Sequence, residues 1–544
     1  MEKELQFLKA DFSGGMNRKD DSTKLQPNQY PLLVNARSRY NALEPIYKPS
    51  QETAGLPASG LYQGVYAAGS IILVFVDGKA YYRDYDSTAV AFSPVIGLQM
   101  DPTVEFIYVE FVPASNKNFT RVASGAPNAA ITLGSNIAQT PQCAIVQDGI
   151  NQPWIINSDG TARVTKNYNQ WTTTEREYVP IGKQMLHHNG ILYVVSPNGT
   201  QIYRSVTGRP LDFVVAVDNT GNKAGDANVV SHAIDYGAIT CIKSLNTDAN
   251  AFFVGTAHRS YMLVPDLNST LFDEPTFNNI PLFTTGPLNQ FSFIELLGDS
   301  AFITFSGIRS FNAVLQLKRE GKNAPFSSEV APFLQDIIQE DVAAVNFDDY
   351  AIFHVASVYG NVNLIYDTLV NRWTAIDKLT GISSIKQFAE IKTPGVRKLF
   401  FITAAGLYEY FGGDSVEKAG WYFGDFVTPA ADIQHKPEML NLVFSEPVEA
   451  GNVSIKVYVD AMLGTSIVAA LNDPVTPQPD QLSFPFGLAN ADRVRVIRQD
   501  LGRDKTGHKL GIYVEWQFNA KLLQAQLNSG TQVNTESQAS LLAI

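Results

Sequence analysis

Short apolar segments with a turn in the middle recur through most of this 544-residue chain. Each combines runs of Val, Ile, Phe, Tyr and Thr with a tight turn, and in several the turn is a pair such as Asp77-Gly78 or Asn198-Gly199, where glycine supplies the positive φ that a β-hairpin needs. The segments span residues 72–85, 144–157, 191–205, 251–263, 301–312, 351–376 and 399–411. This pattern predicts an all-β fold of many short antiparallel strands.

The later segments begin at intervals of roughly 50 residues, which is the sequence spacing of β-propeller blades. A four-stranded blade cannot bury both faces alone, whereas blades stacked around an axis cover one another and expose only short edges. We therefore expect a β-propeller over residues 56–430; a set of unrelated β-domains is the alternative. The first interval is longer and poor in alternation, so residues 86–142 are the expected insertion.

The chain changes character after residue 430. Three segments, residues 454–460, 492–498 and 509–518, alternate strictly between apolar and polar side chains. Such alternation indicates strands with one buried and one solvated face, so we expect an antiparallel β-sandwich over residues 431–520. Residues 521–544 are rich in Gln, Asn, Ser and Thr, and we expect them to be a polar arm, flexible or ordered by a partner.

One segment has the spacing of a helix. In residues 327–342 the apolar side chains recur at helical intervals behind two serines and an early proline. The apolar positions are Val330, Phe333, Leu334, Ile337 and Ile338. We expect a short amphipathic helix packed on a blade; a helix that binds a partner is the alternative.

The charge balance narrows the class of protein. The chain has 41 Lys and Arg against 53 Asp and Glu, a formal net charge of −12, which argues against a basic nucleic-acid-binding protein.

The longest apolar run, residues 70–76, is too short to cross a bilayer, and the first residues lack an apolar signal core. Two cysteines, Cys143 and Cys241, are too few for a disulfide framework. We expect a protein made in the cytoplasm, with no membrane partner.

Motifs for catalysis or metal binding are absent from the sequence. There is no HExxH, no GxSxG and no phosphate-binding GxxxxGK[ST] loop, and adjacent residues on a strand, such as His187 and His188, point to opposite faces. Carboxylate pairs such as Asp348-Asp349 and Glu340-Asp341 are expected to be solvated loop residues rather than a glycosidase pair. We therefore predict no catalytic residue, no metal site and no cofactor.

The first 55 residues are polar, rich in turns and punctuated by prolines, so they cannot form a core of their own. Isolated apolar side chains punctuate them at Phe7, Phe12, Leu25, Tyr30, Leu32, Leu33 and Ile46. The Gly14-Gly15 pair permits a sharp chain reversal. We expect residues 1–55 to be an extended interface segment, and deletion of residues 1–50 to leave a folded propeller but abolish assembly into a ring or with the adaptor.

Several of these motifs resemble one protein family. The opening DFSGGMN (residues 11–17), followed by LQPNQYPLLVNARSRYNALEP (25–45), is similar to the start of the tail nozzle proteins of short-tailed bacteriophages, also called tail tubular protein B-like or packaged-DNA-stabilising hub proteins. The strand and turn patterns of residues 190–213, 238–263, 299–312 and 363–377 look like successive blades of that family. The family often continues with Arg-Pro-Gly, where this chain has a different sequence, Glu44-Pro45-Ile46.

The resemblance implies a structural virion protein that is not an enzyme. It would form a hexameric ring below the portal and its head-to-tail adaptor, assembled in the host cytoplasm and located in the virion tail. Its partners would be further copies of itself, the adaptor, tail fibre or spike proteins, and double-stranded DNA that passes without sequence-specific binding. An acidic chain suits such a conduit, because phosphate contacts by Lys and Arg make DNA bind. The interface residues suggested are Phe12, Gly14, Gly15, Tyr30, Asn35 and Arg37.

A gate is needed to hold DNA in a filled capsid, and loops that meet on the axis are the simplest one. The best candidate is the polar loop of residues 218–228, which lacks the regular ligand spacing of a calcium loop. Its candidate gate residues are Asn219, Gly221, Asn222, Lys223, Gly225 and Asp226. A plain solvent-exposed loop is the alternative reading.

A second functional hypothesis remains open. A propeller-type polysaccharide-binding or glycan-hydrolysing protein would use exposed aromatic side chains to stack on sugars. The candidates for this role are Trp154, Trp171, Trp373 and Trp421, and the competing interpretation is that they fill the cores between blades. A cellular propeller scaffold is a third possibility, but the Gly-His and Trp-Asp blade signatures are missing.

Overall fold

Strands make up almost all of the regular structure in the computed structural model of this protein, so the all-β class is confirmed. The structure describes residues 5–18, 20, 25–39, 41–88, 90–112, 143–156, 162–165, 178–206, 210–213, 228–231, 237–245, 251–265, 277–296, 298–311, 326–338, 341–357, 360–427, 433–459, 480–481, 493–501 and 509–533. No helix in these ranges is long and apolar enough to cross a membrane.

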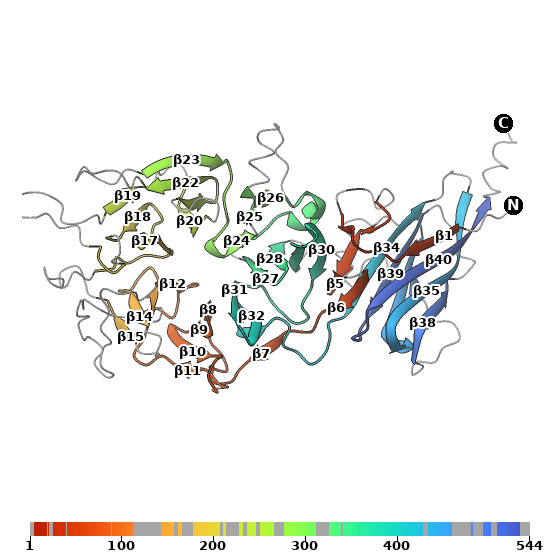
Figure 1. Cartoon of the computed structure of the whole chain (residues 1–544), viewed down its shortest axis with the longest axis horizontal. Helices are drawn as coiled ribbons and strands as arrows, with labels where there is room; N and C mark the ends of the chain where they lie inside the picture. The colour runs from red at the N-terminus through yellow and green to blue at the C-terminus, as the bar shows by residue number, and fades with distance from the viewer. Residues whose placement is uncertain are drawn as a thin grey trace, which may run out of the picture.

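Seven small antiparallel sheets follow one another between residues 50 and 409 (Figure 1). The first four are β8 (Tyr62–Ala68), β9 (Ile71–Val76), β10 (Lys79–Asp84) and β11 (Ser93–Pro94); β12 (Tyr108–Val112), β13 (Cys143–Gln147), β14 (Trp154–Ile156) and β15 (Ala162–Val164); β16 (Met185–His188), β17 (Ile191–Val195), β18 (Gln201–Arg204) and β19 (Asn228–Ser231); and β20 (Ile239–Ser244), β21 (Phe252–Thr256), β22 (Ser260–Pro265) and β23 (Phe277–Phe283). All have four strands in chain order.

The last three sheets vary this plan. They are β24 (Phe293–Leu296), β25 (Asp299–Thr304) and β26 (Gly307–Ser310); β27 (Val342–Phe347), β28 (Tyr350–Ser357), β29 (Gly360–Asp367) and β30 (Arg372–Asp377); and β31 (Gln387–Thr393), β32 (Val396–Thr403) and β33 (Gly406–Glu409), joined by β7 (Ser50–Glu52). The segment just before the first sheet thus supplies the outer strand of the last one. All seven segments predicted to be hairpins form hairpins.

Six of the seven sheets, together with a short helix, contact one another in a closed order, and the remaining sheet contacts β27 through β24. Strand β8 contacts β12, β12 contacts β16, and β16 contacts β20. The short 3-10 helix η4 (Gln290–Ser292) lies between β20 and β27, β27 contacts β31, and β31 contacts β8 again. Figure 1 shows the sheets placed around a common centre, with the N-terminal and C-terminal strands gathered to one side.

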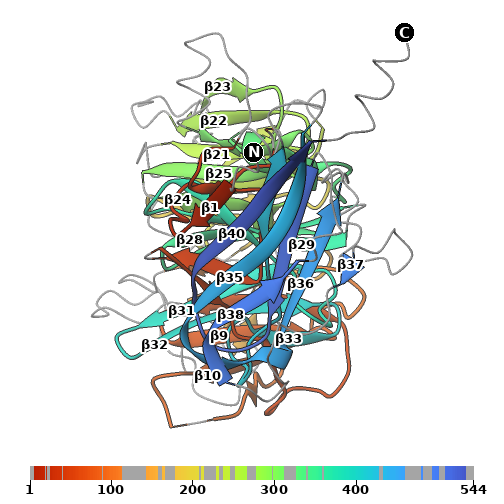
Figure 2. The same ribbon diagram turned by 90° about the vertical axis from the view of Figure 1, so that its right-hand side faces the viewer.

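Two larger layers of strands form that second part of the molecule (Figures 1 and 2). One contains β38 (Arg493–Asp500), β35 (Ile433–Glu449), β40 (Leu522–Val533), β6 (Ala42–Pro45) and β5 (Ala36–Arg39), with β1 (Leu5–Lys9) beside β40. The other contains β4 (Leu32–Val34), β34 (Ala419–Val427), β39 (Lys509–Trp516), β36 (Val453–Val459) and β37 (Asp480–Gln481). Its strand β4 also pairs with β30, the last strand of the sixth small sheet, so that the two sheets are continuous. A short parallel pair, β2 (Gly15–Met16) and β3 (Gln29–Tyr30), lies near β30.

The two layers share one core. Alternate side chains of β35, such as Leu440 and Phe444, are buried, and so are Ile455 of β36 and Val514 of β39. The ring of Phe444 lies edge-on to that of Trp516 in the other layer, with centroids 6.4 Å apart.

The predicted alternation with one buried face describes β36. Strand β39 is instead buried on both faces, since Tyr513 and Glu515 are buried as well as Val514. In β38 the expected face is wrong: Val496 is 40% exposed, while Ile497 is buried.

The predicted polar arm begins too early. Residues 522–533 form β40, which pairs with β35 over most of its length. Leu522, Ala525 and Leu527 are buried against the core, while Gln524 and Gln526 between them are partly exposed, so this segment is a strand of a sheet and not a flexible tail. Residues 534–544 lie outside the described ranges.

Two further expectations need correction. Instead of the α-helix expected over residues 327–342, the structure has a 3-10 helix, η5 (Ser328–Leu334), with Pro332 inside it and extended backbone at Gln335; residues 339–340 lie outside the described ranges. The expected insertion over residues 86–142 also begins too early, since β11 and β12 belong to regular sheets. Residues 113–142 lie outside the described ranges.

Candidate functional site

The N-terminal residues proposed as an intermolecular interface are packed inside the chain instead. Phe12 and Tyr30 are buried, the ring of Phe12 meets that of Trp421 edge-on at 5.4 Å, and the Tyr30 hydroxyl donates to the Thr374 carbonyl at 2.9 Å. Asn35 and Arg37 are buried as well. The interface assignment is therefore wrong for these residues in the folded chain: they join its own segments.

Gly14 and Gly15 make the reversal that the sequence predicted. Gly15 has a φ of 76°, and a Cβ built there would lie 2.6 Å from the carbonyl oxygen of Trp373. The Gly14 carbonyl accepts a hydrogen bond from Arg372 Nη1 at 3.0 Å. Any larger residue at Gly15 would collide with a backbone atom of β30, so this glycine lets the N-terminal segment approach β30 closely.

Other sequence candidates do not converge. The gate residues Asn219, Gly221, Asn222, Lys223, Gly225 and Asp226 lie outside the described residues, as do Trp171 and Glu340. Trp373 and Trp421 are fully buried and cannot stack on a sugar, while Trp154 is half-buried. Asp348 and Asp349 pair with Arg397 and Arg39, at 2.6 and 2.9 Å. Within the described ranges no three His, Cys, Asp or Glu side chains are grouped for a metal ion.

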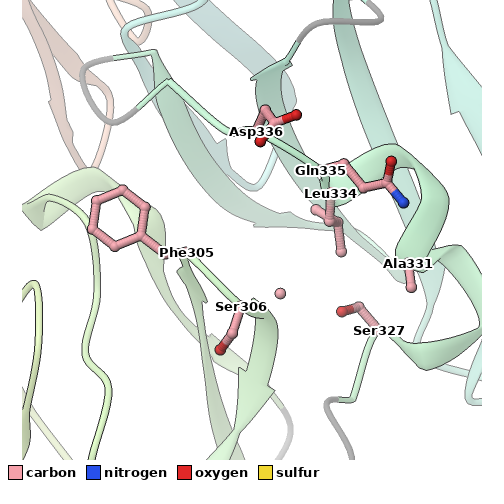
Figure 3. A pocket seen from close by; sticks show the side chains of 8 residues that line it. Phe305, Ser306, Ser327, Ala331, Leu334, Gln335 and Asp336 are labelled. Atoms are coloured by element: carbon pink, nitrogen blue, oxygen red, sulfur yellow. The ribbon is translucent and has the colours of Figure 1, made fainter.

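A surface cavity of about 360 Å³ lies between the β25–β26 turn and η5 (Figure 3). One side is formed by Phe305, Ser306 and Gly307 of the turn. The other side is formed by Ser327, Ala331, Leu334, Gln335 and Asp336. It combines an exposed aromatic ring with hydroxyl, amide and carboxylate groups.

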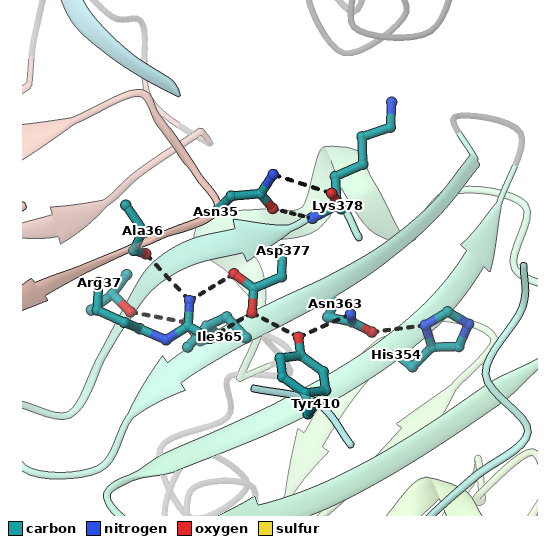
Figure 4. Close-up of polar contacts among 10 residues, drawn as sticks. Asn35, Ala36, Arg37, His354, Asn363, Ile365, Asp377, Lys378 and Tyr410 are labelled. Carbon is teal, nitrogen blue, oxygen red and sulfur yellow. Dashed lines mark hydrogen bonds and ion pairs between the residues drawn. The ribbon is translucent and has the colours of Figure 1, made fainter. Parts of the chain in front are cut away.

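A buried ion pair connects the N-terminal segment to β30 (Figure 4). Arg37 Nη1 donates to Asp377 Oδ1 at 2.6 Å, and Nη2 donates to Oδ2, so the pair is bidentate. The two side chains are 8% and 0% exposed. Burial by itself lowers the pKa of the Arg37 guanidinium, but the charge of Asp377 offsets this and holds that pKa above its ordinary value.

A directed chain of hydrogen bonds continues from this pair. Tyr410 donates to Asp377 Oδ2 at 2.7 Å, and Asn363 Nδ2 donates to the Tyr410 hydroxyl at 3.0 Å. His354 completes the chain: its Nε2 accepts from the Ile385 amide at 2.9 Å, so its Nδ1 carries the proton and donates to Asn363 Oδ1 at 2.8 Å. Burial lowers the pKa of His354 to about 4, which keeps this tautomer neutral.

Asn35 provides a second link beside the ion pair. Its φ of 51° places it in the left-handed region, which asparagine tolerates better than most residues. Its side chain accepts from the Lys378 amide at 2.6 Å and donates to the carbonyls of Lys378 and Lys418, at 3.1 and 3.0 Å. Three segments that are distant in sequence are therefore fastened by one amide. We call Asn35, Arg37, His354, Asn363, Asp377 and Tyr410 the junction network.

Four members of the junction network were missed by sequence reasoning. His354 stands within a mostly apolar strand, Asn363 lies in a strand that also contains Asn361, Asp377 ends β30, and Tyr410 directly follows Glu409. A single polar residue within an apolar strand is the signal that could have suggested a buried hydrogen bond, but no pattern states which residue it meets.

The chain matches no family model, and it matches no curated protein.

Proposed function

We propose that the seven small sheets are the blades of a β-propeller and that the two larger layers form a β-sandwich attached to it. The closed order of contacts from β8 through β31 and back to β8 supports this. The pairing of β7 with β33 also supports it, because a strand from the N-terminal side completing the last sheet ties the two ends of a propeller together.

We further propose that the protein is a structural subunit of the tail nozzle of a short-tailed bacteriophage, a conduit for DNA ejection. The family resemblance of residues 11–45 suggests this role. The observation that carries it is the junction network, because the ion pair of Arg37 and Asp377 fastens β5 of the larger layers to β30 of the small sheets. A hinge between two domains would suit an enzyme that opens and closes, whereas a fastened joint suits a subunit that bears load.

The centre of the ring of sheets contains large side chains. The ring centroid of Phe291, a residue of η4, lies 5.1 Å from that of Phe106 and 6.4 Å from that of Tyr108. Tyr108 belongs to β12, which is not a neighbour of η4 in the order of contacts. Lys386 lies over the Phe106 ring at 5.4 Å and pairs with Glu105 at 3.4 Å. DNA would accordingly run between subunits of the assembled ring, not along the axis of one propeller.

The test of this function is assembly. The purified chain, alone and mixed with the adaptor protein of the same virion, is examined by light scattering and by particle images. We expect closed rings of several copies that bind the adaptor. A chain that stays monomeric with and without the adaptor would contradict the proposal.

A further inference from the structure

The cavity beside Phe305 has the size and position of a ligand site. Its volume of about 360 Å³ falls within the range of small-molecule pockets in proteins, and it opens at the surface between a hairpin turn and η5. Gly307 and the buried residues Ser327 and Leu334 form its floor, while Phe305, Gln335 and Asp336 stand exposed at its rim. This arrangement combines a fixed base with side chains that can reach a ligand.

An aromatic surface is presented at the rim. Phe305 is 48% exposed although it is a large apolar side chain, and the ring of His258 lies nearly parallel to it at 24°, with centroids 6.5 Å apart. The face of an exposed aromatic ring can receive the C–H groups of a ligand.

The hydroxyl groups of the cavity are already oriented. Ser327 Oγ accepts from the Ile308 amide at 2.9 Å, and with 0% of its surface exposed it belongs to the fixed base of the cavity (Figure 3). Ser306 Oγ accepts from Arg309 Nη2 at 3.1 Å and lies 3.2 Å from Thr304 Oγ1. Because the Thr304 hydroxyl donates to the Gly307 carbonyl at 2.7 Å, Ser306 gives its own proton to Thr304 and offers a ligand an acceptor.

The set of groups favours one chemical class. Asp336 and Ser306 offer acceptors next to an apolar ring face, and the exposed Gln335 side chain stands beside them. A sugar ring carries hydroxyls that both donate and accept around its edge and has C–H groups on its face. A phosphate would be repelled by the Asp336 carboxylate, and a hydrocarbon would leave the polar groups without partners.

We propose that this cavity binds one pyranose unit of a neutral saccharide, with Phe305 against its C–H face and Asp336 accepting its hydroxyls. The inference stands apart from the nozzle role, because it rests on this cavity alone and needs no assembled ring.

Saturation-transfer NMR of the full chain tests the proposal, with the methyl glycosides of glucose, mannose and galactose as probes. We expect at least one glycoside to bind. Phe305→Ala should weaken its binding about tenfold, and Phe305→Tyr, which keeps a ring, should retain it. Asp336→Asn should weaken binding severalfold without disturbing the turn, because asparagine tolerates the left-handed φ of 51° at that position.

The control is Ile150→Ala, which removes an exposed apolar side chain in the loop between β13 and β14 and should leave binding unchanged. The proposal is overturned if none of the three glycosides binds, if binding survives both Phe305→Ala and Asp336→Asn, or if inorganic phosphate binds at the cavity in their place. Ring assembly in the same preparations reports on the nozzle role separately, since none of these positions belongs to the junction network.

Discussion

Replacing Arg37 by methionine should destabilise the folded chain more than any exposed charge replacement. Methionine keeps much of the volume of arginine but removes both hydrogen bonds to Asp377. Asp377 is 0% exposed, so its carboxylate would remain buried with only the Tyr410 hydroxyl as a neutral donor. The Arg37 guanidinium also lies 5.2 Å from the centre of the Tyr350 ring, and this contact is lost as well.

The expected cost follows from the burial of the pair. Breaking a buried ion pair by removing one partner costs about 3–5 kcal/mol, because the remaining charge is uncompensated. The matched control is Arg397→Met, which breaks the pair with Asp348, where the two side chains are 49% and 35% exposed. An exposed pair contributes only about 0–1 kcal/mol. Adding Asp377→Asn to Arg37→Met should restore part of the loss, since no buried charge then remains.

The assay is urea unfolding followed by tryptophan fluorescence. Trp373, Trp421 and Trp516 are fully buried in the core that the junction network borders, so their emission reports this region. The midpoint should fall well below that of the wild type for Arg37→Met and only slightly for Arg397→Met. If the two variants shift the midpoint equally, the ion pair does not fasten the N-terminal segment and the reasoning fails.

Three further outcomes are expected. His354 takes up a proton below pH 6.5 in the unfolded chain but only near pH 4 in the folded chain. The free energy of unfolding should therefore fall as the pH is lowered from 6.5 to 4, by up to about 3 kcal/mol at about 1.4 kcal/mol per pH unit. Urea midpoints at pH 5 and 7 should show this loss in the wild type and not in His354→Gln. Deleting residues 1–50 should unfold the two larger layers instead of yielding a folded chain that merely fails to assemble, because β4, β5 and β6 are removed; a truncated chain with unchanged circular dichroism and melting temperature would refute this. Shortening residues 219–226 should leave ring assembly intact and let packaged DNA leak from filled particles, and particles that retain their DNA would exclude this loop as the gate.

Local patterns predicted the small sheets well. The turn Asp77-Gly78 has φ values of 50° and 74°, as a tight hairpin requires, and the flanking strands β9 and β10 pair in full register. Such pairing depends on residues close in sequence, so the alternation of side chains and the turn residues are sufficient to identify it.

Long-range pairing could not be predicted in the same way. Strand β7 pairs with β33 although more than 350 residues separate them, and β40 takes its place between β35 and the N-terminal strands. Neither Ser50–Glu52 nor the Gln-rich β40 has a strong apolar pattern in its own sequence. Each becomes a strand by pairing with a segment that is distant in the chain. The junction network shows the same limit: Arg37 and Asp377 become partners only after the chain has folded.

A cryo-electron microscopy map of the virion tail tests most directly the proposal that this chain is a ring subunit of a phage tail nozzle. We expect copies of this fold in a closed ring below the portal and adaptor, with DNA or an empty channel between the subunits and none along the propeller axes. A map in which the nozzle density fits another protein, or in which this chain occupies a fibre, a spike or no position in the virion, would contradict it.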